Sequence, residues 1–154
     1  DVNPEAGIIH ADSVVSVSDP DAIEGKDVLV VEDGPTLTHG GTSFGAGRVA
    51  AENHGATMID PRDAAVGSIN ETFHEYPHIG NVLPAMGYGD EQIAELEETI
   101  NNADCDVVLL GTPADLRNIL DVNKPVVRVK YDLEEKDLTL KEILEQHSDV
   151  LDQA

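Results

Sequence analysis

Two acidic residues end an apolar run near the start of the chain, and a loop of hydroxyls, glycines and one histidine follows them. The residues concerned are Glu32, Asp33, Thr36, Thr38, His39, Gly40 and Gly41. Carboxylates suit Mg²⁺ when phosphate oxygens and waters complete its coordination. Glycines let backbone N–H groups approach phosphate oxygens closely, and a histidine in such a loop can donate a hydrogen bond, exchange protons or be phosphorylated. The pattern predicts a phosphorylated ligand, with Mg²⁺ at Glu32 and Asp33.

These residues also have a purely structural interpretation. Asp33-Gly34 is a common turn dipeptide, so the two acids can simply mark the exit from a strand. A turn histidine such as His39 can bond to the backbone without touching a ligand. The order of the features, from a strand through acids and a glycine-rich loop into a helix, favours a ligand site.

The loop continues through Gly45 and Gly47 into an expected helix. Its spacing resembles a dinucleotide fingerprint, but the glycines come about a dozen residues after the strand instead of directly behind it. A nicotinamide site is therefore not expected. What we expect is a helix N-terminus open to an anion, with Gly45 and Gly47 as candidate phosphate-binding positions.

Arginine is scarce, and three of the four arginines flank loops that follow apolar runs. These are Arg48, Arg62 and Arg117, whereas Arg128 lies within the last expected strand. Arginine recognises phosphate and carboxylate with two parallel hydrogen bonds, although ion pairs with the many acids explain each arginine equally well. Thr112 and Asp115 share the third loop; we interpret them first as helix-start residues and second as ligand contacts.

Alternating strands and helices should bring these loops together. Strands are expected at Ser13–Val17, Asp27–Val31, Ala56–Ile59, Asp106–Leu110 and Pro125–Val129. Helices are expected to start with capping boxes at Ser68 and Thr139, at Asp90, and behind a Thr112 cap. This order predicts an α/β fold of three layers, in which helices cover both faces of a mostly parallel sheet of about five strands.

Ligands of such sheets bind beyond the carboxyl ends of the strands. That rule selects the loops Glu32–Gly47, Asp60–Arg62 and Gly111–Pro113, and we expect them to face one crevice. The stretch Tyr76–Gly89, rich in proline and glycine, is interpreted as a long functional loop or lid.

Charge and composition narrow the class of protein. The formal net charge is −22 and 40% of the 154 residues are hydrophobic, in periodic blocks, which argues against a disordered acidic chain. A nucleic-acid mimic would concentrate its acids in runs, whereas here they are scattered. Few lysines and few aromatics favour adaptation to concentrated salt, which screens self-repulsion. We therefore expect a halophilic, cytoplasmic protein with no nucleic-acid or membrane partner.

The single cysteine, Cys105, agrees with a reducing compartment and is interpreted as a small buried residue. By length we expect residues 1–154 to form a single α/β domain. The start at Asp1, not at Met, is interpreted as the sign of a longer nucleotide-binding enzyme whose C-terminal part this is.

Several longer motifs resemble the archaeal cyclic 2,3-diphosphoglycerate synthetase family, which has GTPase-like relatives. They cover the stretches 30–41, 44–47, 60–62, 65–69, 76–89 and 111–116. The resemblance implies a ligase that uses ATP, or GTP, and Mg²⁺ to close a phosphoanhydride within a phosphorylated small molecule, with potassium as a further candidate ion and a homo-oligomer as one assembly.

The resemblance also implies roles for individual residues. Catalysis is assigned to His39, Thr38 and Arg48, metal binding to Glu32 and Asp33, and cofactor binding to Thr36, Gly40, Gly41, Gly45, Gly47, Arg62, Thr112 and Asp115. The family's upstream phosphate-binding loop is absent from this sequence, so we expect the fragment alone to be inactive. The competing interpretation is a non-catalytic domain for nucleotide sensing or oligomerisation.

Overall fold

A computed structural model describes residues 6–87 and 89–146. The chain divides into two compact units. The larger comprises Val15–Lys130, and the smaller combines Asp1–Val14 with Tyr131–Ala154. That the whole chain forms a single domain stays a prediction.

A mostly parallel sheet forms the centre of the larger unit. β2 pairs in parallel with β5 on one side, and with β3 and β4 on the other, where β3 meets the start of β2 and β4 meets its end. β6 pairs in parallel with β5, and β1 lies beside β6, to which it runs antiparallel. The strands are β1 (Ala11–Val17), β2 (Asp27–Asp33), β3 (Thr57–Met58), β4 (Leu83–Ala85), β5 (Val107–Leu110) and β6 (Val126–Glu135).

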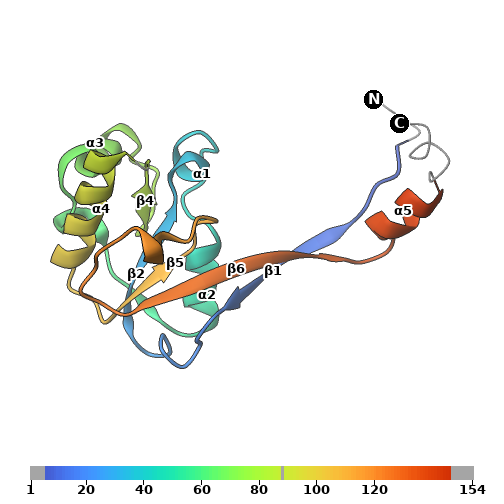
Figure 1. Cartoon of the computed structure of the whole chain (residues 1–154), viewed down its shortest axis with the longest axis horizontal. Coiled ribbons are helices and arrows are strands. Elements are labelled where there is room, and N and C mark those ends of the chain that lie inside the picture. Colours follow the sequence, from blue (N-terminus) through green and yellow to red (C-terminus); the bar gives the residue numbers. More distant parts are fainter. Residues whose placement is uncertain (1–5, 88, 147–154) are drawn as a thin grey trace. The chain divides into compact units, whose positions relative to one another are not determined.

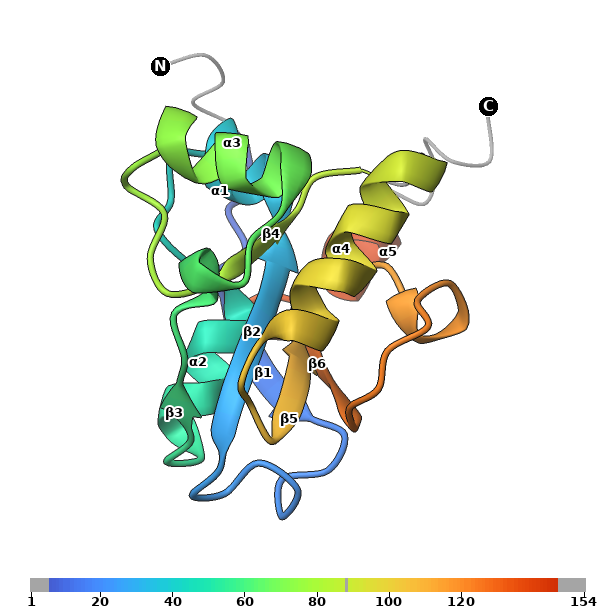
Figure 2. The same ribbon diagram turned by 90° about the vertical axis from the view of Figure 1, so that its left-hand side faces the viewer.

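Helices cover both faces of this sheet. Figure 1 shows α3 and α4 on one side and α2 on the other, and in Figure 2 α3 and α4 lie in front of β2. The helices are α1 (Gly34–Thr38), α2 (Ala46–Asn53), α3 (Gly67–Glu75), α4 (Asp90–Asn102) and α5 (Leu140–Gln146), with 3₁₀ turns η1 (Pro61–Asp63) and η2 (Leu116–Asn118). The predicted three-layer α/β fold with a mostly parallel sheet is therefore confirmed.

The core explains why the apolar runs are continuous and not alternating. Val28, Leu29, Val30 and Val31 of β2 have no exposed surface, and β5 is buried along its whole length. Strands covered on both faces must be apolar at every position. The buried centre of the sheet fixes where the loops behind β2 and β5 begin.

Three local predictions need correction. The stretch 76–89 contains β4, a three-residue strand that was expected to be loop, and its Tyr88 lies outside the described residues. α3 begins at Gly67 without a side-chain cap, because the Ser68 hydroxyl bonds to Glu95 instead. The helix expected behind Thr112 is replaced by the short turn η2, capped by Asp115.

The smaller unit consists of the outer parts of β1 and β6 and the helix α5. The Lys136 N–H donates to the His10 carbonyl at 2.8 Å, and the Lys136 ammonium pairs with Asp12 at 2.6 Å. The predicted capping box at Thr139 is confirmed, since Thr139 and Glu142 exchange side-chain and backbone bonds. In the described part of the chain, no helix combines the length and apolarity needed to cross a membrane.

Candidate functional site

Glu32 is a buried carboxylate at the end of β2, 1% exposed. Its Oε1 accepts the backbone N–H groups of Gly45 at 3.0 Å and Arg48 at 2.9 Å, so it occupies the N-terminus of α2. Burial raises the pKa of this carboxyl above its ordinary value, and the backbone donors act in the opposite direction. The expectation that this helix end is open to an anion is therefore wrong, because the chain's own carboxylate lies there.

Three glycines close around that carboxylate. A Cβ on Gly45 would lie 2.6 Å from Glu32 Oε2, and one on Gly111 would lie 2.4 Å from the same atom. A Cβ on Gly47 would meet Val30 at 2.7 Å and Glu32 at 3.0 Å. The close approach of α2 and the loop behind β5 to Glu32 accounts for glycine at all three positions. A cofactor contact at Gly45 and Gly47 stays a prediction.

Asp33 has a different environment from its neighbour. Successive residues of a strand point to opposite faces, and Asp33 turns to α1, where its Oδ2 accepts the Thr36 N–H at 3.2 Å and the Thr36 hydroxyl at 2.7 Å. Asp33 is thus the N-cap of α1, with Pro35 in the first turn. The two acids have separate protein partners, and joint Mg²⁺ binding by Glu32 and Asp33 stays a prediction.

The end of α1 presents an imidazole with a defined orientation. The buried Thr38 hydroxyl donates to the Gly34 carbonyl at 3.0 Å, and His39 Nδ1 lies 3.0 Å from the same hydroxyl oxygen. In a neutral ring that donates from Nδ1 to this oxygen, Nε2 carries the lone pair. That tautomer can accept a proton or bond an electrophile at Nε2.

Gly40 and Gly41 turn the chain directly after His39. A Cβ on Gly40 would lie 2.4 Å from the Thr36 carbonyl oxygen, and Gly41 has a φ of +65°. Side chains are disfavoured at both positions for reasons of backbone geometry. Phosphate binding by Thr36, Gly40 and Gly41 stays a prediction.

The 76–89 stretch is attached to this loop instead of lying free above it. His78 Nε2 donates to the Leu37 carbonyl at 2.9 Å, and the Gly80 N–H donates to the Ser43 carbonyl at 2.9 Å. A Cβ on Gly34 would lie 2.5 Å from the Ala85 carbonyl oxygen, so β4 also packs tightly against the start of α1. Any movement of this segment as a lid must break these bonds.

Each of the three loop arginines has a local carboxylate partner. Arg48 pairs with Glu52 at 2.7 Å and lies over the Phe44 ring, and Arg62 bonds both oxygens of Asp60 at 2.9 and 3.0 Å. Exposed pairs of this kind contribute only about 0–1 kcal/mol. A substrate anion can therefore replace the carboxylate at small cost, and both interpretations of these arginines stay open.

Arg62 also ties two of the loops together. Its Nη2 donates to the Ile79 carbonyl, and its guanidinium lies 4.9 Å from the centre of the Phe73 ring. Since Gly80 bonds to Ser43, the chain from Asp60 to Arg62 is connected to the loop behind His39 through residues 79 and 80.

The third loop holds an arginine that the sequence analysis set apart. Arg128 in β6 pairs with Asp115 at 3.1 Å and donates to the Pro113 carbonyl at 3.3 Å, while Arg117 contacts the same aspartate at 2.8 Å. The hydrogen bond from Arg117 is the main reason why the pKa of Asp115 lies well below its usual range. Thr112 is buried, and its hydroxyl accepts the Ala114 N–H at 3.4 Å. The alignment of β5 with β6, which pairs Leu110 with Arg128, is what places this arginine here.

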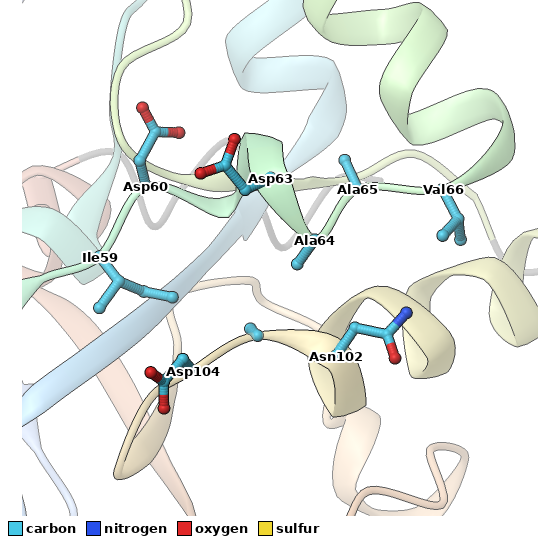
Figure 3. Close-up of a pocket in the computed structure, with 9 residues that line it drawn as sticks. Ile59, Asp60, Asp63, Ala64, Ala65, Val66, Asn102 and Asp104 are labelled. Carbon is cyan, nitrogen blue, oxygen red and sulfur yellow. The ribbon is translucent and has the colours of Figure 1, made fainter.

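A cleft of about 620 Å³ borders the second loop (Figure 3). Its walls include Ile59, Asp60 and Asp63 on one side and Asn102 and Asp104 on the other. In Figure 3 the carboxylates of Asp60 and Asp63 point away from Asn102. Of the three predicted loops, the second contributes Asp60 to the lining of this cleft, and none of the residues assigned a catalytic, cofactor-binding or metal-binding role lines it.

The chain is similar to a curated protein whose name states an activity. It is 62% identical over 147 residues to "Arginine synthetase ArcE" of Thermococcus kodakarensis, an alignment that covers 94% of this chain. The chain spans about a third (33%) of that relative's length. No protein-family profile matches the chain. No solved structure matches it either. The similarity is thus to a synthetase of archaeal type, as the sequence analysis expected, but of another product than a cyclic diphosphoglycerate.

Proposed function

We propose that this chain is the acceptor-side domain of a nucleotide-dependent synthetase whose product is arginine. The observation that carries the proposal is the 62% identity, over 94% of the chain, to a protein named as an arginine synthetase. Synthetases couple the formation of a new bond to the cleavage of a nucleoside triphosphate. Because the chain covers only a third of that relative, the activity of the whole protein belongs to the proposal.

The product limits the chemistry. Arginine differs from the corresponding ureido amino acid by one nitrogen in place of the ureido oxygen. A nucleoside triphosphate supplies the phosphoryl group that makes this oxygen a leaving group; ammonia then bonds to the carbon, phosphate leaves, and a proton is lost from the new nitrogen. Such reactions depend mostly on positioning and on neutralising charge.

The described residues do not fit a triphosphate at the N-terminus of α2. Glu32 already accepts two N–H groups there, and a second anion beside a buried carboxylate would be repelled. The part of the synthetase that corresponds to the rest of the relative therefore holds the nucleotide in this proposal. Mg²⁺ contact from Asp33 remains part of it, at the border between the two parts.

The residues around His39 supply the acceptor-side chemistry in this proposal. His39 Nε2 accepts the proton from the attacking nitrogen, and Thr38 holds the ring in the required tautomer. Arg48 and Arg62 bind the carboxylate or phosphoryl oxygens of the substrate in exchange for Glu52 and Asp60. Arg48 lies in α2, directly after the His39 loop, and Arg62 is connected to that loop through Ile79 and the Gly80–Ser43 bond.

The test uses the complete parent protein in concentrated KCl with MgATP, ammonium and the ureido amino acid. We expect arginine in amino-acid analysis, together with equal amounts of ADP and phosphate in phosphorus NMR. A parallel reaction with 2,3-diphosphoglycerate tests the product implied by the family resemblance. If this second reaction gives a cyclic pyrophosphate signal and the first gives no arginine, the product is the cyclic diphosphoglycerate and not arginine. If ADP and phosphate form without either product, the protein is a nucleotide hydrolase.

A further inference from the structure

Most of the large apolar side chains that are exposed lie in the smaller unit. Of the eight such side chains among the described residues, six belong to it. They are Ile8, Val14, Tyr131, Leu133, Leu140 and Leu144. Val14 lies opposite Asp132 on the charged face of the ribbon, and we call the other five the ribbon surface. Soluble proteins rarely expose this much apolar surface over so few residues unless it contacts something.

The alternation along β6 shows that this strand is built for burial over its whole length. Val127 and Val129 are buried, and Tyr131 and Leu133 follow on the same face because side chains repeat every second residue. Yet Tyr131 is 47% and Leu133 77% exposed. The alternate positions are all charged: Arg128, Lys130, Asp132 and Glu134. Within the smaller unit taken by itself, the continuation of this apolar face at Tyr131 and Leu133 is exposed.

The hydrogen-bonded pairing of β6 with β5 ends before Tyr131, where the exposed part of the apolar face begins. β5 pairs with β6 from Val126 to Arg128 and ends at Leu110, whereas β6 continues to Glu135. Beyond the β5 ladder, β6 lies beside β1, and its last residue, Glu135, accepts the Leu140 N–H of α5 at 2.7 Å. Two-stranded ribbons are marginally stable in water and normally need a third strand or a packed layer.

The helix α5 repeats the pattern. Leu140 and Leu144 are one turn apart and both exposed, while Ile143 faces Gly7 within the unit. Lys141 and Glu145 form an ion pair on another side of the helix. An exposed apolar stripe on a helix of this length is typical of a helix that packs against another surface.

Charge and length select the occupant. The described residues of the smaller unit hold seven acids and two lysines, so a second copy would bring like charges together. The relative is about three times as long as this chain. Two thirds of that synthetase therefore have no counterpart in this chain, and they are a candidate for the contact. On the basis of the proposed function, we propose that the ribbon surface docks on the remaining part of the synthetase, at a patch that is apolar in its centre and basic at its rim.

Hydrogen exchange on the complete parent synthetase tests the docking. We compare wild type with Leu133→Asp, which puts a charge on the ribbon surface, and with the matched control Glu134→Gln on the opposite face of β6. Peptides from 129 to 145 are expected to exchange at least about tenfold faster in Leu133→Asp than in wild type, and equally in wild type and Glu134→Gln. Equal exchange in all three proteins would overturn the proposal.

Two further readouts make the result unambiguous. Light scattering over a range of protein concentrations measures whether the protein is a monomer or a dimer. If a dimer dissociates on dilution and the slow hydrogen exchange of peptides 129–145 is lost with it, the surface contacts a second copy, and docking within one synthetase is refuted. Peptides from β2 and β5 must exchange alike in all variants, since Leu133 is exposed and its replacement leaves the core intact. Arginine formation is measured separately, so protection without arginine would contradict the proposed function and leave the docking standing.

Discussion

Glu32 shows how one buried residue can determine the geometry around it, since its carboxylate holds the start of α2. Its position after a buried strand is typical of a metal-binding acid, and the sequence offers no sign that it accepts two N–H groups of a helix that starts 14 residues later. Only the fold brings that helix end and Gly111 to the same carboxylate. Whether Glu32 also meets Mg²⁺ in the complete protein stays a prediction.

The raised pKa of Glu32 has a consequence for stability. A carboxyl whose pKa is higher in the folded than in the unfolded chain contributes stability that is fully present below the unfolded value of about 4.5 and is lost as pH rises through the folded value. Glu32→Gln removes this dependence and keeps an oxygen acceptor. The melting temperature of the variant minus that of wild type is therefore expected to increase between pH 4.5 and 7.5.

Scanning calorimetry at fixed ionic strength measures this difference, and the exposed Glu98→Gln serves as the control. A difference for Glu32→Gln that stays constant over the whole pH range would show that the folded and unfolded pKa values of Glu32 coincide.

The catalytic role of His39 stays a prediction, and the structure places its Nδ1 3.0 Å from the Thr38 hydroxyl oxygen. We expect His39→Ala to lower kcat of the parent protein by about a hundredfold to ten-thousandfold, the usual contribution of a positioned acid or base. The melting temperature should change little, because the side chain is exposed.

Steady-state kinetics over a range of pH makes the measurement. Thr38→Val, which keeps the shape but removes the hydroxyl, should give a smaller loss of kcat because it frees the ring without removing it. Unchanged turnover of His39→Ala would exclude His39 from the chemistry.

At the scale of elements, the buried strands β2 and β5 were predictable, whereas the short strand β4 and the partners of several side chains were not. The continuous apolar runs located β2 and β5, since burial on both faces leaves no freedom of residue type. β4 was missed because it is only three residues long and includes Pro84, between turn residues that favour a loop. Arg128 was set apart from the other arginines because its partner, Asp115, belongs to another loop and meets it only through the alignment of β5 and β6.

Ser68 illustrates the same limit for helix caps. The Ser68–Glu71 spacing predicts a capping box, but the structure caps the start of α3 from α4: Glu95 accepts both the N–H and the hydroxyl of Ser68. A partner 27 residues away leaves no local signal. This long-range cap connects α3 to α4, which pack against each other on the same face of the sheet.

Glu95→Ala should therefore destabilise the fold by about 1–3 kcal/mol, since it leaves a partly buried N–H and hydroxyl without their acceptor. Urea unfolding monitored by circular dichroism gives the change in the free energy of unfolding. Glu98→Ala lies on the same helix, is exposed, and should cost at most about 0.5 kcal/mol. Equal effects of the two substitutions would mean that the cap from α4 contributes nothing.

At the scale of the whole molecule, the fold pairs few of the many surface acids with basic side chains. Of the acids, Glu32 alone is buried among the described residues, so the others confront one another across the surface. The ion pairs of Arg48, Arg62 and Arg117 offset three of them. With 31 acids against nine lysines and arginines, repulsion must oppose compaction wherever salt is dilute.

We therefore expect the stability of the chain to depend steeply on salt. Raising KCl from about 0.1 M to about 3 M shortens the screening length from about 10 Å to below 3 Å, which is less than the spacing of most surface charges. The melting temperature should rise by at least about 5 °C, or roughly 2 kcal/mol for a chain of this size. Sucrose at equal osmolality stabilises by exclusion from the surface but does not screen charge, and so should give a smaller rise. Equal rises in sucrose and KCl would mean that the surface acids do not repel one another appreciably, and the interpretation of this composition as an adaptation to concentrated salt would have to be abandoned.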